Sequence, residues 1–142
     1  MKSTIKIDGL IYPVGAINLH FQYFLDDGSP RAWLDIHSDS KDDRLAGLAI
    51  NGLNIGNIPS LDGLYGRSFS IDPSDEADGA ELSESVFWKP DQETLEISAL
   101  QLQFGTLQGD LLPLEIVAKC FDHEGNQDIS VAIIGEATVS ST

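Results

Sequence analysis

The stretch Ile129-Ser130-Val131-Ala132-Ile133-Ile134-Gly135-Glu136-Ala137-Thr138-Val139 decides the fold, because apolar and polar residues alternate along it. A period of two is typical of a strand with one buried face and one face in water. The alternation reaches back, with short breaks, to Thr94. The apolar parity of the quoted stretch comprises Ile129, Val131, Ile133, Ala137 and Val139.

A second alternating stretch comes just before this one, with its apolar parity at Leu114, Ile116, Ala118 and Cys120. The segment between the two stretches, Asp122-His123-Glu124-Gly125-Asn126, has the composition of a hairpin connection. The sequence therefore predicts an antiparallel pair of strands, with the thiol of Cys120 in the core.

A third apolar run changes face in its middle. Its odd-numbered positions are apolar up to Ala99, and its even-numbered positions are apolar from Leu100 onward. Such a switch predicts a β-bulge or a bend near Ala99, by which one long strand crosses between two sheets. The apolar residues of this run are Leu95, Ile97, Ala99, Leu100, Leu102 and Phe104.

The first half of the chain contains shorter strand patterns. Residues 16–25 alternate strongly, and residues 32–36 form the returning strand of a hairpin. For residues 45–50 the pattern fits a strand or a short helix, and we favour the strand. Further strands are predicted at residues 67–71 and 86–88.

Three tetrapeptides of the form apolar-Asp/Asn-Gly-Leu punctuate this half, at residues 7–10, 50–53 and 61–64. Asp-Gly and Asn-Gly tolerate the positive φ angles of a type I′ turn. Each tetrapeptide is therefore predicted to form a tight hairpin corner between two strands.

Together these patterns predict an all-β protein with one domain over residues 1–142. We expect about eight to ten antiparallel strands in a two-sheet sandwich, of jelly-roll or immunoglobulin-like topology, or in a flattened barrel. A chain of 142 residues with 42% hydrophobic content can fill one such core.

The composition narrows the classes of partner and the location. Eight Lys and Arg residues against 23 Asp and Glu residues give a net charge of −15, which disfavours nucleic acid and anionic membranes as partners. A single cysteine excludes an intrachain disulfide, and no signal peptide or membrane-spanning run is recognisable. The expected location is the cytoplasm.

The polar parity of the first hairpin offers a candidate metal site. If Tyr23 pairs with Leu34, then His20 lies opposite His37, and Gln22 lies opposite Asp35. Two imidazoles and a carboxylate at that distance could hold Zn²⁺. The alternative is an ordinary solvated face, and it is favoured because no fourth ligand is visible.

The same register places Phe24 opposite Trp33 on the outer face. Two adjacent aromatic rings can anchor a protein interface or stack on a sugar ring, unless a loop or a second sheet covers them. Gln22 lies beside them on this face. Trp88 is the other candidate aromatic residue, although its strand pattern leaves its face undecided.

The acidic segment at residues 72–81 is the second place where a cation could bind. Its spacing departs from the EF-hand pattern, so only an irregular Ca²⁺ site or a solvated loop fits it. No cofactor is otherwise expected.

No catalytic constellation can be assembled from the sequence, which favours a non-enzymatic role. We expect a binding or assembly module that engages a protein partner or a second copy of itself as a homo-oligomer. The rival hypothesis is a module that binds a small ligand or carbohydrate, possibly with a metal, around His20, His37 and Trp33.

Overall fold

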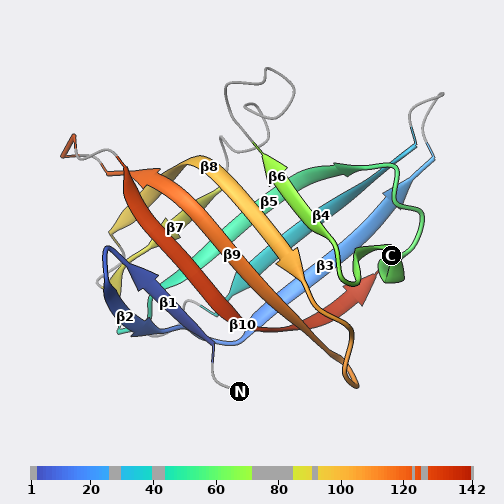
Figure 1. Cartoon of the computed structure of the whole chain (residues 1–142), viewed down its shortest axis with the longest axis horizontal. Helices are drawn as coiled ribbons and strands as arrows, with labels where there is room; N and C mark the ends of the chain where they lie inside the picture. The colour runs from blue at the N-terminus through green and yellow to red at the C-terminus, as the bar shows by residue number, and fades with distance from the viewer. Residues whose placement is uncertain are drawn as a thin grey trace.

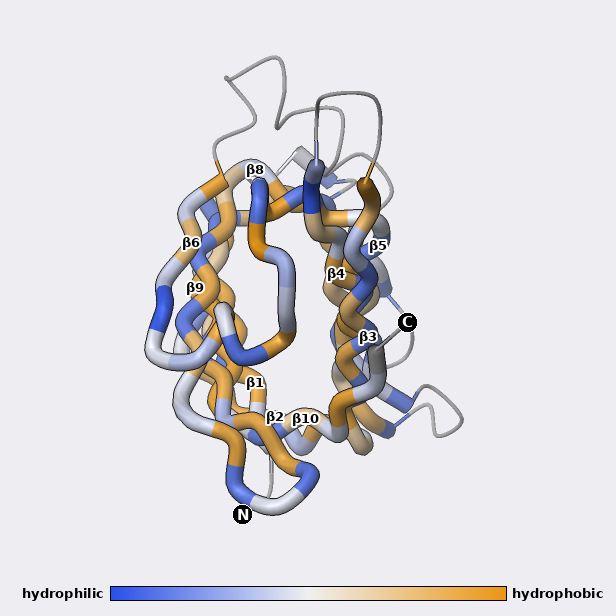
Figure 2. The backbone as a smooth tube through the Cα atoms, turned by 90° about the vertical axis from the view of Figure 1, so that its right-hand side faces the viewer, coloured by the Kyte–Doolittle hydropathy of each residue, from blue (hydrophilic) through white to orange (hydrophobic). Residues whose placement is uncertain are grey.

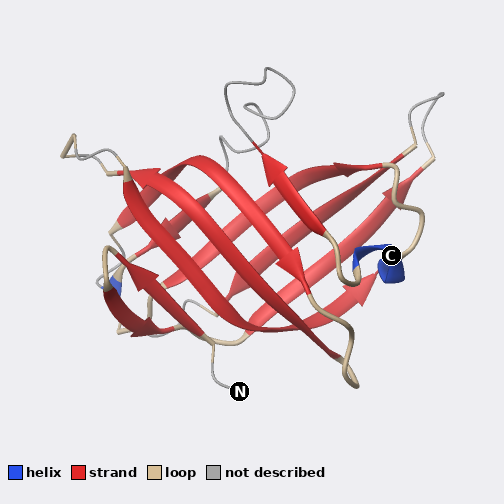
Figure 3. Cartoon of the chain, viewed as in Figure 1, coloured by secondary structure: helices blue, strands red, loops and turns tan. Residues whose placement is uncertain are grey.

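The computed structural model describes residues 3–25, 30–39, 44–71, 85–90, 93–122, 124–125 and 128–141. These residues form ten strands and one short 3-10 helix, and strands dominate the chain (Figure 3). The elements are β1 (Thr4–Ile7), β2 (Leu10–Pro13), β3 (Ile17–Phe24), β4 (Arg31–Ser38), β5 (Gly47–Gly56), η1 (Leu61–Leu64), β6 (Ser68–Ile71), β7 (Val86–Trp88), β8 (Thr94–Phe104), β9 (Leu111–Phe121) and β10 (Ile129–Ser141).

Seven of the strands close into a barrel, in the order β3, β4, β5, β7, β8, β9 and β10, with β10 returning to β3. The closing pair is parallel, with Ala137–Ser141 beside Ile17–Phe21, whereas the other pairs are antiparallel. The all-β prediction and the flattened-barrel alternative are therefore supported. The expectation of a purely antiparallel sheet was wrong, because the end of β10 runs alongside β3.

The barrel has two broad walls whose strands cross obliquely (Figure 1). Strands β8, β9 and β10 form one wall, which β1 and β2 extend beside β10 and β6 extends beside β8. Strands β3, β4 and β5 form the opposite wall, and Figure 2 shows the two walls from the side. Strand β10 belongs to both, because it pairs with β9 and β1 along its first part and with β3 at its end.

The core lies between the walls and follows the predicted parity. Along β10, Ile129, Val131, Ile133 and Ala137 are buried, and Val139 is half-buried. The predicted inward positions of β9 are also buried. Among them Cys120 is completely enclosed, and this burial raises the pKa of its thiol to about 12.

The predicted bulge near Ala99 is confirmed. The pairing of β8 with β9 shifts register between Ile97 and Ala99. Odd-numbered apolar residues are buried before the shift, and even-numbered apolar residues are buried after it. The bulge divides the strand between two neighbours, since β7 pairs with residues 94–96 and β6 pairs with residues 100–103.

One of the three predicted hairpin corners is confirmed. Asp8 and Gly9 have φ angles of 47° and 89° and connect β1 to β2. Asn51-Gly52 instead lies inside β5, and Asp62-Gly63 lies in η1. Both corner predictions were wrong, although Gly52 does adopt the positive φ, at 63°, that suggested a turn. Residues 47–50 are strand, as we favoured.

The predicted cation-binding segment and the predicted absence of a membrane span remain to be compared with the structure. The whole acidic segment, residues 72–81, lies outside the described residues. Within the described ranges, no helix has the length and apolar character needed to cross a bilayer.

Candidate functional site

Strands β3 and β4 form the first hairpin, and their register differs by two residues from the predicted one. The structure places His20 opposite Asp35, Gln22 opposite Trp33 and Phe24 opposite Arg31. The predicted pairs of His20 with His37, Gln22 with Asp35, and Phe24 with Trp33 were therefore wrong. The outward face is unchanged, because a shift of two residues preserves the parity of a strand.

This register separates the two histidines that were considered for Zn²⁺. His20 Nδ1 lies 2.8 Å from Ser140 Oγ on one neighbouring strand, whereas His37 Nε2 lies 2.6 Å from Asn51 Oδ1 on the other. Asp35, which was predicted to face Gln22, lies opposite His20. Among the residues that the structure describes, no three His, Cys, Asp or Glu side chains come together in a group that could hold a metal ion.

A bulge in β5 shapes the outer face next to Asp35. Leu34 pairs with Leu53 and Ile36 pairs with Ile50, so Asn51 and Gly52 together face Asp35. The backbone N–H of Gly52 donates a hydrogen bond of 2.7 Å to Asp35 Oδ1. Glycine suits this position because the φ angle of 63° is costly for residues with a Cβ atom.

Trp33 lies at the centre of this outer face and is packed from several sides. The ring of Phe24 meets it edge-on, with centroids 6.2 Å apart and planes at 85°. The guanidinium carbon of Arg31 lies 5.5 Å from the centroid of the indole. A Cβ atom on Gly52 would come within 3.2 Å of the indole, so the missing side chain makes room for the ring.

These residues enclose a shallow pocket of about 370 Å³ on the β3–β4–β5 wall. Its surface combines two aromatic rings with a cation, a carboxylate and an amide. Such a pocket can take one apolar or aromatic group and hydrogen-bond its polar edge. We call it the Trp33 pocket, and its lining residues are Gln22, Phe24, Arg31, Trp33, Asp35 and Gly52.

Phe24 is the exposed apolar residue of the Trp33 pocket, at 39% exposure. An aromatic ring left this exposed in a pocket forms a surface that binding would cover. Leu25 follows Phe24 and is 85% exposed, but it continues the inward parity of β3 and does not line the pocket. The Trp33 pocket is therefore the candidate site.

Trp88 does not belong to this site. It lies on β7 and is only 8% exposed, and its indole occupies the space that a side chain on Gly47 would need. The buried Nε1 atoms of both Trp88 and Trp33 have no hydrogen-bond partner among the described residues. Of the four predicted binding residues, the structure brings Gln22, Phe24 and Trp33 together and leaves Trp88 apart.

Arg31 and Gly52 line the Trp33 pocket but were not among the predicted site residues. Arg31 adjoins a predicted loop and lies on the polar parity of β4, so the pattern gave it no role, and only the true register places it opposite Phe24. Gly52 was recognised as a residue with positive φ but was assigned to a hairpin corner. A bulge and a corner require the same glycine conformation, which makes them hard to distinguish from sequence.

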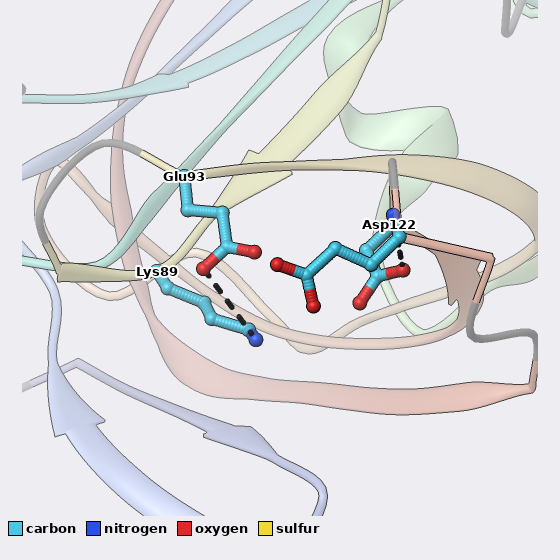
Figure 4. A network of polar contacts seen from close by, with 4 residues as sticks. Lys89, Glu93 and Asp122 are labelled. Atoms are coloured by element: carbon cyan, nitrogen blue, oxygen red, sulfur yellow. Dashed lines mark hydrogen bonds and ion pairs between the residues drawn. The ribbon is translucent and has the colours of Figure 1, made fainter.

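Figure 4 shows a second group of polar residues, none of which lines the Trp33 pocket. Lys89 Nζ is 3.8 Å from Glu93 Oε2, and both side chains are substantially exposed. Asp122 Oδ1 accepts a 3.0 Å hydrogen bond from the backbone N–H of Glu124, which stabilises the turn after β9. Exposed ion pairs and local turn bonds of this kind are structural features of many surfaces, so we assign this group no binding role.

Comparison with known proteins adds no functional assignment: no protein-family model, curated protein or solved structure matches the chain.

Proposed function

We propose that the protein is a non-enzymatic binding module that engages a protein partner through the Trp33 pocket. The observation that carries the proposal is the cluster of Trp33, Phe24 and Arg31 on one outer face, in mutual contact. Tryptophan and arginine are enriched among the residues that dominate protein–protein affinity, and aromatic side chains are common in interfaces.

The geometry of the cluster supports this function in a second way. Trp33 is held by Phe24, Arg31 and the bulge at Gly52, so little conformational entropy remains to be lost when a partner binds. Polar groups of Gln22 and Asp35 line the same pocket. Such groups set the orientation of a partner, while the apolar surface supplies most of the affinity.

A carbohydrate is the main alternative ligand for an aromatic pocket of this kind. Arg31 favours the protein partner, because its guanidinium lies over the Trp33 ring, where a sugar ring would have to stack. A glycan array probed with the wild-type protein distinguishes the two classes of ligand. Binding to a glycan that Phe24→Ala abolishes would replace our proposal with the carbohydrate function.

The proposal is tested by comparing immobilised wild-type protein with Phe24→Ala and Arg31→Ala in extracts of the source organism. We expect at least one protein to be retained by the wild type and lost from both variants. Phe121→Ala, which removes an exposed aromatic side chain from β9 on the opposite wall, is the matched control and should retain that protein. Identical sets of retained proteins on all four surfaces would contradict the proposal.

Self-association is a second candidate function, supported by a different surface. Ile11 on β2, Ile134 on β10 and Val117 on β9 face outward and are 67%, 53% and 45% exposed. An exposed apolar sheet face of this kind can pair with a second copy. Pairing through an edge of β10 is not available at residues 131–134 and 137–138, where β10 is paired on both sides.

The charge of −15 gives the self-association candidate a distinctive test. Like-charge repulsion between two copies weakens as salt screens it, so a dimer held by apolar contacts should tighten between low and moderate salt. Light scattering measures this directly. A monomer of 15.4 kDa at both salt concentrations would exclude the candidate, and Ile134→Asp should dissociate any dimer that forms.

A further inference from the structure

The barrel wall is incomplete between β5 and β6. Both β7 and β6 lie beside β8 on the side away from β9, at residues 94–96 and 100–103 respectively. Strand β7 continues the sheet to β5 through Gly47–Ala49, but within the described part of the chain no strand pairing joins β6 to β5. A crevice of about 330 Å³ separates them, and we call it the β5–β6 seam.

The two sides of the seam are formed by short segments of β5 and β6 that line the same crevice. The seam is lined by residues 54–56 of β5 and residues 69–71 of β6. The bulge at Asn51-Gly52 immediately precedes this part of β5. Because a bulge bends its strand and increases the local twist, it accounts for the departure of β5 from the position in which it would pair with β6.

The backbone of β6 presents hydrogen-bonding groups to the seam. The N–H of Phe104 donates a 3.0 Å hydrogen bond to the carbonyl of Arg67, which fixes the phase of the β6–β8 ladder. Antiparallel ladders alternate, so Phe69 and Ile71 bond to β8, whereas the N–H and C=O groups of Ser68 and Ser70 point away from it. The side of β6 away from β8 is the seam.

The side chains of the seam lack the features that usually prevent strand addition. Exposed strand edges are commonly blunted by charged residues or proline. Neither residues 53–56 nor residues 68–71 contain either, whereas the edge strand β2 is short and ends in Pro13. Ile55 and Phe69 are only partly buried although they pack against the core, so the seam leaves apolar core surface uncovered.

We propose that the β5–β6 seam accepts an extended segment of a partner protein, which adds to the barrel as a strand beside β6. The inserted segment would direct apolar side chains inward at alternate positions, over Ile55 and Phe69, and polar side chains outward beside Ser70. The net charge of −15 favours a segment that carries lysine or arginine. This is recognition by strand addition, in which backbone hydrogen bonds give affinity and alternate side chains give specificity.

The size of the seam indicates how the segment enters. Strand and sheet spacings give roughly 160 Å³ for each residue of a strand, so the seam has room for about two residues. A longer segment requires β6 to move outward. We expect β6 to be the strand that moves, because within the described residues its strand pairing is confined to four residue pairs with β8.

The test begins with a random 12-residue peptide library displayed on phage and selected on the folded protein. We expect enriched peptides with apolar residues at alternate positions, and we expect Ser70→Pro to raise the Kd of a synthetic copy at least tenfold. Proline removes the N–H that faces the seam without removing a bond to β8. Ser70→Ala keeps that N–H and should bind as the wild type does, and Phe24→Ala should also bind normally, because the Trp33 pocket is a separate site.

Two further measurements keep the test independent of how Ser70→Pro folds. N-methylation of every second peptide amide should abolish binding for one of the two sets, odd or even positions, because only one set faces β6. Bound peptide should also slow hydrogen exchange at the amides of Ser68 and Ser70. No enrichment over a protein-free surface, or binding that neither the proline variant nor N-methylation weakens, would overturn the proposal. Protection of Ser68 and Ser70 that rises with protein concentration, without peptide, would assign the seam to a second copy and overturn it as well.

Discussion

The backbone N–H of Gly52 lies 2.7 Å from Oδ1 of Asp35 and donates a hydrogen bond to it, which ties the bulge of β5 to the middle of β4. The same bulge leaves room for the indole of Trp33, because Gly52 has no side chain, and it precedes the part of β5 that diverges from β6. One local irregularity therefore shapes both the Trp33 pocket and the β5–β6 seam.

Gly52→Ala should destabilise the protein by about 2–4 kcal/mol. A non-glycine residue at this φ angle costs of order 1 kcal/mol, and a Cβ atom 3.2 Å from the Trp33 ring adds about 1–3 kcal/mol of overpacking. Urea denaturation measures the change. Gly109→Ala is the matched control, because Gly109 has a φ angle of 68° but no heavy atom within 4 Å of the added Cβ. Equal losses in the two variants would show that the indole yields without cost.

Asp35→Ala should lower stability by about 1–3 kcal/mol, because it leaves the N–H of Gly52 without its acceptor in a partly buried position. Asp35→Asn keeps an oxygen acceptor at the same place and should recover much of the loss. The melting temperatures of the wild type, Asp35→Ala and Asp35→Asn measure these changes in stability. If the alanine and asparagine variants unfold alike, the hydrogen bond to Gly52 does not stabilise the bulge.

Ile133→Asp should abolish folding or reduce stability by several kcal/mol, because Ile133 is fully buried and the carboxylate would have no partner there. Its neighbour Ile134 points outward, so Ile134→Asp should change the monomer's stability by about 0.5 kcal/mol or less. Circular dichroism melts of the two variants test the parity of β10. Similar melting temperatures would contradict the assignment of the buried face.

The stability contributed by Cys120 should depend on pH. Its folded pKa of about 12 lies above the unfolded value of ~8.5, so between these values the unfolded state loses a proton that the folded state keeps. This contribution is complete below about pH 8.5 and is lost as the pH rises, by roughly 2 kcal/mol at pH 10. Urea denaturation of wild type and Cys120→Ala at pH 8 and pH 10 isolates the effect. An identical pH dependence in both proteins would show that the thiol is not desolvated.

The strand faces could be predicted from the sequence because burial imposes a period of two. That period predicted the inward residues of β9 and β10 and the face switch at Ala99, and the structure confirms both. The same period could not fix the register of β3 with β4. A shift of two residues leaves every side chain on its own face, so His20 faces Asp35 instead of His37 without any change in the apolar pattern.

Closure of the barrel depends on information that local patterns do not contain. The parallel contact of β10 with β3 joins residues more than 100 positions apart, and nothing in either strand specifies its partner. The Trp33 pocket was only partly predicted for a related reason. Parity placed Gln22, Phe24 and Trp33 on one face, whereas the contributions of Arg31 and Gly52 depend on pairing between strands.

Photo-crosslinking in the source cells tests the central claim, that a protein partner binds at the Trp33 pocket, most directly. A benzophenone amino acid is placed at position 24 in one variant and at position 121, on the outer face of the opposite wall, in another. We predict a covalent adduct with another protein from position 24, weakened by Arg31→Ala, and no such adduct from position 121. Adducts from position 121 alone, or none from position 24 at matched expression, would contradict the account.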